Sequence, residues 1–114
     1  IMIGGGTSGK FSGNIIEHGK GDAINCFGTE VEISDNTITL DNTGGKLAVY
    51  VSDKLCKDEA KIRIHENSIA ASSLPLIKFT QAGRSSKCVV KNNKLTPQFS
   101  IEKYFVVELE ETKN

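Results

Sequence analysis

Four short segments of the chain share one pattern of apolar and polar positions. Each reads apolar, x, apolar, x, x, Asn, x, apolar, and the segments occupy residues 9–16, 31–38, 62–69 and 88–95. Gly9 fills the first apolar place of the first copy, and the other apolar places hold Val, Ile, Leu, Phe or Cys. A pattern that recurs in this way is typical of repeat architectures, in which each copy buries its apolar face against its neighbours.

The asparagine of each copy stands between two expected strands. Alternation before it marks a strand with one buried face, and the apolar residue two places after it begins a second strand. Asn tolerates the left-handed conformation better than any residue except Gly, so we expect it to make the bend. Stacked copies would also let each side-chain amide hydrogen-bond the next. The predicted structural turn residues are Asn14, Asn36, Asn67 and Asn93.

A third apolar strand precedes each copy and also follows the last one. These segments lie near residues 1–3, 24–26, 49–51, 77–79 and 105–107. The asparagines recur after 22, 31 and 26 residues, which indicates a minimal turn with insertions in its loops, the longest at residues 53–61. The sequence therefore predicts an all-β fold, a right-handed single-stranded parallel β-helix with three strands per turn and about four to five turns.

An antiparallel β-sandwich is the competing fold, because it also has short alternating strands separated by turns. It does not explain why the same Asn recurs at the same place relative to both strands. Helices are disfavoured because β-branched residues, Gly and Asn are dense and no stretch keeps a spacing of 3.6.

Residues 1–114 are expected to form one β-helix domain. Ile1-Met2-Ile3 already has the pattern of a strand in register, so we expect either that the domain is the C-terminal part of a longer chain or that another subunit covers this end. An uncovered end would expose apolar core and unpaired strand edges.

Composition argues against several classes of binding partner. Fourteen basic and 14 acidic residues give a net charge of zero, so the sequence predicts no nucleic-acid partner. No apolar run approaches the ~20 residues that span a bilayer, and no membrane partner is expected. Three cysteines are too widely spaced for a zinc site or a disulfide framework, so no metal or cofactor is predicted. Cys26 and Cys88 are expected in the core, and Cys56 lies in a charged loop that could expose it.

Residues 31–38, preceded by Ala23-Ile24-Asn25-Cys26, resemble the pectate-lyase-like superfamily of right-handed parallel β-helices. This resemblance implies a polysaccharide partner, a role like that of a phage tailspike or a polysaccharide-processing protein, and a virion or extracellular location. Tailspike-like β-helices also pack as homotrimers. No catalytic motif of these families can be placed on this sequence, so the resemblance implies fold more strongly than activity.

Outward positions of the first strand would form one strip on the wall of the helix. Tyr50 could stack on a sugar ring, and Asn25 and Lys78 could bind hydroxyl groups or a carboxylate, so these three are the predicted substrate-binding residues. The alternative is a solvated surface strip. The other residues expected to point outward here are Ala48 and either Val106 or Glu108.

Glycoside hydrolysis requires a pair of carboxyl groups. The acids of the loops beside this strip, and therefore the weak catalytic candidates, are Asp22, Asp53, Asp58 and Glu59. His18 and His65 are interpreted as a strand end and a turn residue rather than general bases. The outward residues of the second strand, Lys10, Glu32, Arg63 and Val89, are interpreted as a structural ladder of alternating charge.

Residues 4–10 match the spacing of a phosphate-binding loop, but Phe11 stands where Ser or Thr should hold magnesium, and a glycine-rich turn is the preferred interpretation. Three functions remain open from the sequence. The first is a carbohydrate-binding module, the second a structural or assembly module of a trimeric fibre, and the third a polysaccharide lyase or glycoside hydrolase. Whether the chain is an enzyme is left undecided.

Overall fold

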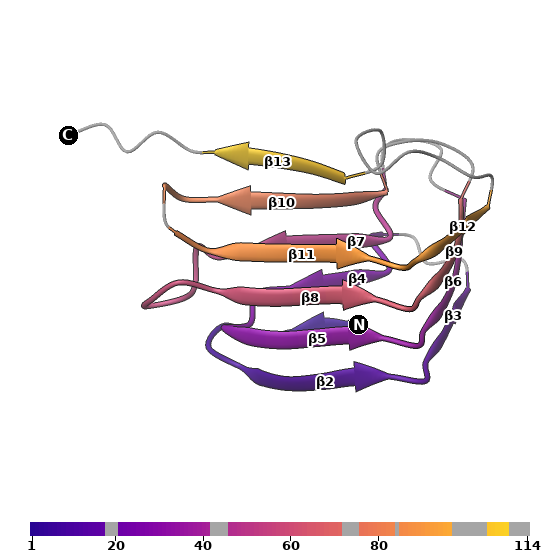
Figure 1. Cartoon of the computed structure of the whole chain (residues 1–114), viewed down its shortest axis with the longest axis horizontal. Helices are drawn as coiled ribbons and strands as arrows, with labels where there is room; N and C mark the ends of the chain where they lie inside the picture. Colours follow the sequence, from indigo (N-terminus) through magenta and orange to yellow (C-terminus); the bar gives the residue numbers. More distant parts are fainter. Residues whose placement is uncertain (18–20, 42–45, 72–75, 84, 97–104, 110–114) are drawn as a thin grey trace.

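The computed structural model describes residues 1–17, 21–41, 46–71, 76–83, 85–96 and 105–109. Within these residues all regular structure is β-strand, arranged in three parallel sheets that build a β-solenoid (Figure 1). Sheet A contains β1 (Met2–Ile3), β4 (Ile24–Cys26), β7 (Val49–Ser52), β10 (Ile77–Gln81) and β13 (Phe105–Leu109). Sheet B contains β2 (Ser8–Ser12), β5 (Glu30–Ser34), β8 (Lys61–His65) and β11 (Lys87–Lys91). Sheet C contains β3 (Ile15–Glu17), β6 (Thr37–Leu40), β9 (Ser68–Ala71) and β12 (Lys94–Thr96).

Each turn of the solenoid contributes one strand to each sheet, which confirms the expected plan of three strands per turn. Sheets B and C pass through three complete revolutions between their first and fourth strands, slightly fewer than the turns expected. Sheet A has a fifth level because β13 pairs with β10. In the described part of the chain, no helix is long and apolar enough to cross a membrane.

The core consists of apolar columns, because the inward residues of successive turns lie in register. Val31 pairs with Ile62 and Ile33 with Ile64 across β5 and β8, and all four side chains are buried. Burial of each such side chain contributes about 1.5–3 kcal/mol. Parallel strands at this spacing therefore gain stability at every level of the stack.

The predicted asparagine ladder is present. The side-chain Nδ2 of Asn14 donates to Oδ1 of Asn36 at 2.9 Å, and Asn36 donates to Asn67, and Asn67 to Asn93, at 3.0 Å each. The backbone N–H of Asn14, Asn36 and Asn67 donates to the same Oδ1 atoms at 3.0 Å. Each of these oxygens thus accepts two hydrogen bonds from the preceding turn.

The left-handed residue of the turn is not the asparagine, and this expectation was wrong. Positive φ angles occur one position earlier, at Asp35 (56°), Glu66 (57°), Asn92 (54°) and Gly13 (72°). With the bend made by the preceding residue, the asparagine side chain can point into the stack, where Asn36 and Asn67 are almost fully buried. The asparagine is therefore selected for its amide group, and its neighbour carries the unusual backbone angle.

Cys56 is also placed differently from expectation. It is buried, with 3% of its surface exposed, although it lies in a charged loop. Its thiol Sγ donates to the carbonyl of Gly28 at 3.3 Å, so the loop folds back onto the preceding turn. Cys26 is fully buried as predicted, and Cys88 is partly buried and packs against the core.

Candidate functional site

The predicted strip on sheet A exists as a row of paired residues. Asn25 of β4 lies opposite Tyr50 of β7, Tyr50 lies opposite Lys78 of β10, and Val106 of β13 continues the row. Asn25, Tyr50 and Lys78 are half-buried, which leaves part of each side chain accessible on the outer face. Ala48, which we also expected to point outward, is fully buried.

Two contacts hold the row in place. The Tyr50 ring meets the Phe27 ring edge to face, with ring centroids 6.1 Å apart and an interplanar angle of 87°. The Lys78 ammonium group forms an ion pair of 2.9 Å with the Glu108 carboxylate of the neighbouring strand. The aromatic ring is therefore fixed in orientation, and the lysine beside it is partly neutralised.

The structure disperses the four loop acids. Asp22 Oδ1 accepts a hydrogen bond from the backbone N–H of Leu47 at 2.8 Å, and the buried Asp53 accepts one from Ala82 at 3.0 Å. Each of these carboxylates thereby ties its loop to the next turn. Asp58 and Glu59 are exposed and lie beside a separate small hollow near Lys61.

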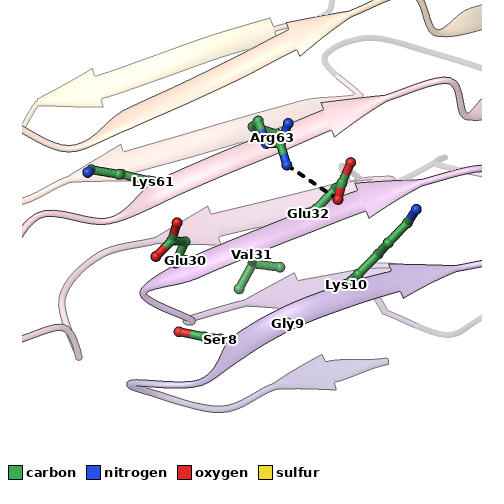
Figure 2. A pocket seen from close by; sticks show the side chains of 8 residues that line it. All are labelled: Ser8, Gly9, Lys10, Glu30, Val31, Glu32, Lys61 and Arg63. Atoms are coloured by element: carbon green, nitrogen blue, oxygen red, sulfur yellow. Dashed lines mark ion pairs between the residues drawn. The ribbon is translucent and has the colours of Figure 1, made fainter.

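A larger hollow, of about 520 Å³, lies on the outer face of sheet B (Figure 2). Its polar lining comes from three neighbouring strands, β2, β5 and β8. The polar residues that line it are Ser8, Lys10, Glu30, Glu32, Lys61 and Arg63. The expected ladder of alternating charge is in register here, because Lys10 pairs with Glu32, Glu32 with Arg63, and Arg63 with Val89.

Glu32 is the most constrained charged residue of this face. Its Oε1 lies 2.6 Å from His65 Nε2, and its Oε2 lies 3.3 Å from an Arg63 guanidinium nitrogen. Because a carboxylate only accepts hydrogen bonds, Nε2 is the protonated nitrogen in this contact. The hydrogen bond from His65 lowers the pKa of the Glu32 carboxyl, and the positive charges of Arg63 and Lys10 lower it further.

His65 is the last residue of β8 and has a partner that sequence reasoning missed. Its strand pairing places it opposite Ser34, two residues beyond Glu32, so the contact with Glu32 is diagonal. An alignment of the repeats identifies only the residues that lie directly opposite one another on neighbouring strands. A long side chain can also reach the residue two places along the neighbouring strand. Ser34 is fully buried, and its hydroxyl has no hydrogen-bond partner among the described residues.

The described residues form neither a cluster of metal ligands nor a phosphate-binding loop. No cluster of His, Cys, Asp and Glu that could hold a metal ion occurs within the residues placed by the structure. The glycine-rich segment is a turn followed by β2, and no helix starts there. His18 lies outside the described residues.

Comparisons of the chain with protein families, with curated proteins and with solved structures gave no match. The functional argument therefore depends on the solenoid fold and on the side chains that its sheets bring together.

Proposed function

We propose that this chain is a carbohydrate-binding β-solenoid module that holds a polysaccharide along the outer face of sheet A. The observation that supports this most is the row of Asn25, Tyr50 and Lys78, which come from three neighbouring strands and lie in register. A polysaccharide is a repeating polymer, and a stack of strands spaced by about 4.8 Å offers it a repeating set of contacts.

The chemistry of the row suits sugar recognition. An aromatic ring can cover the apolar face of a sugar, and amide and ammonium groups can bind its hydroxyl groups. The Phe27 contact limits the motion of the Tyr50 ring, so less conformational entropy is lost when a ligand binds. The resemblance to pectate-lyase-like β-helices, which include phage tailspikes, supports the same class of ligand.

The experiment is a screen of the full chain on a glycan array, followed by titration calorimetry with the best oligosaccharide. Tyr50→Ala should weaken binding about ten-fold, the equivalent of ~1.4 kcal/mol, whereas Tyr50→Phe should bind nearly as well because it keeps the ring. Lys57→Ala, at an exposed position of the loop that contains Cys56, serves as a surface control. Absence of binding to any glycan, or equal binding by Tyr50→Ala and the parent chain, would refute the proposal.

A structural or assembly module of a trimeric fibre is the second candidate, and it is favoured by exposed apolar side chains at the end levels of the stack. Met2 and Ile15 are 69% and 76% exposed at one end, and Leu109 is 68% exposed at the other. Apolar surface of this kind is often covered by another subunit. Sedimentation equilibrium tests this candidate, because a monomer at micromolar concentration would exclude it.

A further inference from the structure

The outer face of sheet B carries an uneven distribution of charge, although the chain as a whole is neutral. The outward residues of β8 and β11 are Lys61, Arg63, His65, Lys87, Val89 and Lys91. None of these six is acidic, and four are permanently cationic. The acidic outward residues of the sheet, Glu30 and Glu32, are on β5.

Most of this positive charge is not neutralised by ion pairs. Arg63 pairs with Glu32, but the structure gives Lys61, Lys87 and Lys91 no ion pair with a described carboxylate. Lys61 lies opposite Lys87 on one side and Glu30 on the other, and His65 lies opposite Lys91, so the Cα atoms of each pair are about one strand spacing apart. Cations on neighbouring strands of one face raise its positive potential, which favours a bound polyanion.

The hollow between β2, β5 and β8 gives this face a concave site. Lys61 and Lys10 stand at opposite ends of it in Figure 2, with their ammonium groups pointing away from one another, and Glu32 lies between Lys10 and Arg63. Glu32 contacts both Arg63 and His65, so its carboxylate orients the guanidinium group on this face. Ser8 and Glu30 add groups that can bind hydroxyls.

We infer that the outer face of sheet B binds an acidic polysaccharide, with separate carboxylate or sulfate groups of one polymer beside Lys10, Arg63 and Lys61 and further acidic groups over Lys87 and Lys91. A guanidinium group held by a second carboxylate is well placed to accept a planar anion. This site is separate from the row on sheet A and does not depend on it.

Nucleic acid fits this face less well than an acidic sugar polymer. The outward positions of β2, β5, β8 and β11 carry no Phe, Tyr or Trp, and single-stranded nucleic acids bind largely by stacking on such rings. A hollow with a serine hydroxyl and a carboxylate among its cations instead suits a ligand that has both hydroxyl groups and negative charges.

The test uses the full chain, with polygalacturonate as the acidic polymer and its fully methyl-esterified form as the neutral one. Titration calorimetry at two salt concentrations should show binding to polygalacturonate that weakens as salt rises, and little binding of the neutral form at this face. Lys61→Gln combined with Lys87→Gln should weaken the affinity for polygalacturonate at least about ten-fold. Lys57→Gln combined with Lys94→Gln removes the same charge from positions outside sheet B and should change it less than about two-fold.

The variants separate this inference from the proposal for sheet A. If Tyr50→Ala abolishes polygalacturonate binding and the sheet B double variant does not, the inference is overturned and the sheet A site stands. If the double variant weakens it and Tyr50→Ala does not, the inference is supported. Equal loss in the Lys57/Lys94 control, or tighter binding of single-stranded DNA than of polygalacturonate, would overturn the assignment to an acidic polysaccharide. Thermal melts of each variant confirm that the fold is retained.

Discussion

Asn36 donates two hydrogen bonds to a single atom, Oδ1 of Asn67, one from its backbone N–H and one from its side-chain Nδ2, each 3.0 Å long. Asn67 in turn donates to the Ile33 carbonyl in the preceding turn and to Asn93 in the following one. One side chain thus joins three levels of the stack. Both side chains are almost fully buried, so these bonds are shielded from solvent.

Replacement of Asn67 by Ala should therefore be strongly destabilising. It leaves the buried N–H group of Asn36 without an acceptor, leaves Asn36 Nδ2 with the Phe11 carbonyl alone, and removes the bond from Asn67 to the Ile33 carbonyl. We expect a loss of about 3–5 kcal/mol in the free energy of unfolding, measured by urea denaturation. Asn14→Ala is the matched control, because Asn14 lies at the first level of the ladder and is only partly buried. Its loss should be about 1–2 kcal/mol. Equal losses of unfolding free energy at the two positions would contradict a larger contribution from the buried part of the ladder.

Asp35, the left-handed residue before Asn36, should tolerate replacement by Gly but not by a β-branched residue. Asp35 has a φ of 56° and is exposed, so Asp35→Gly should leave stability unchanged or raise it by about 0.5–1 kcal/mol, whereas Asp35→Val should lower it by about 1–3 kcal/mol. Thr37→Gly, two residues later in β6, is the control and should be destabilising by about 0.5–1 kcal/mol because Gly weakens a strand. Thermal melts of the three variants rank them. A stabilised Asp35→Val protein would mean that the bend lies elsewhere.

Glu32 should make stability depend on pH. Its pKa is lowered in the folded state by the hydrogen bond from His65, so its contribution is present above the unfolded-state value and is lost as pH falls through the lower folded value. The difference in unfolding free energy between the parent chain and Glu32→Gln should therefore shrink as pH falls below the ordinary value of 4.5. Urea denaturation between neutral pH and pH 3 measures this difference. Glu30→Gln, on the same strand but without an ion pair to a described residue, is the control and should show a smaller dependence.

Gly28 is required for close packing of the loop before β5. A Cβ atom at this position would lie 2.3 Å from Val31 Cγ2 and 2.7 Å from the Thr7 carbonyl oxygen. Gly28→Ala should thus cost about 2–3 kcal/mol, because the carbonyl belongs to the backbone and cannot move aside easily. Gly21→Ala is the matched control, since a Cβ there meets nothing within 4 Å. A melting temperature of Gly28→Ala equal to that of Gly21→Ala would show that this loop adapts freely.

The repeat alone was sufficient to predict the strands, their register and the asparagine ladder. Inward positions such as Ile33 and Ile64 hold only apolar residues, and the asparagine is identical in all four copies. Both patterns can therefore be recognised in a single sequence. The position of the left-handed residue was not predictable in the same way. It holds Gly13, Asp35, Glu66 or Asn92, and no shared side chain marks it.

Two further features lay beyond sequence reasoning for different physical reasons. Cys56 is surrounded in sequence by charged residues, and only the return of its loop onto Gly28 buries it. The contact between His65 and Glu32 joins positions that are not opposite one another. Both depend on the three-dimensional path of the chain rather than on the alternation within one strand. The row of Asn25, Tyr50 and Lys78 could be predicted, because the repeat shows which residues of neighbouring strands lie directly opposite one another.

The ladder bonds have nearly the same length although the chain between successive asparagines varies from 22 to 31 residues. The extra residues lie outside the bend between sheets B and C, so a turn of the solenoid can lengthen a loop without disturbing its asparagine. This separation makes the scaffold permissive to evolutionary insertion. New loops can arise on one turn at a time and alter what the surface recognises, while selection on the inner amides and apolar columns keeps the architecture unchanged.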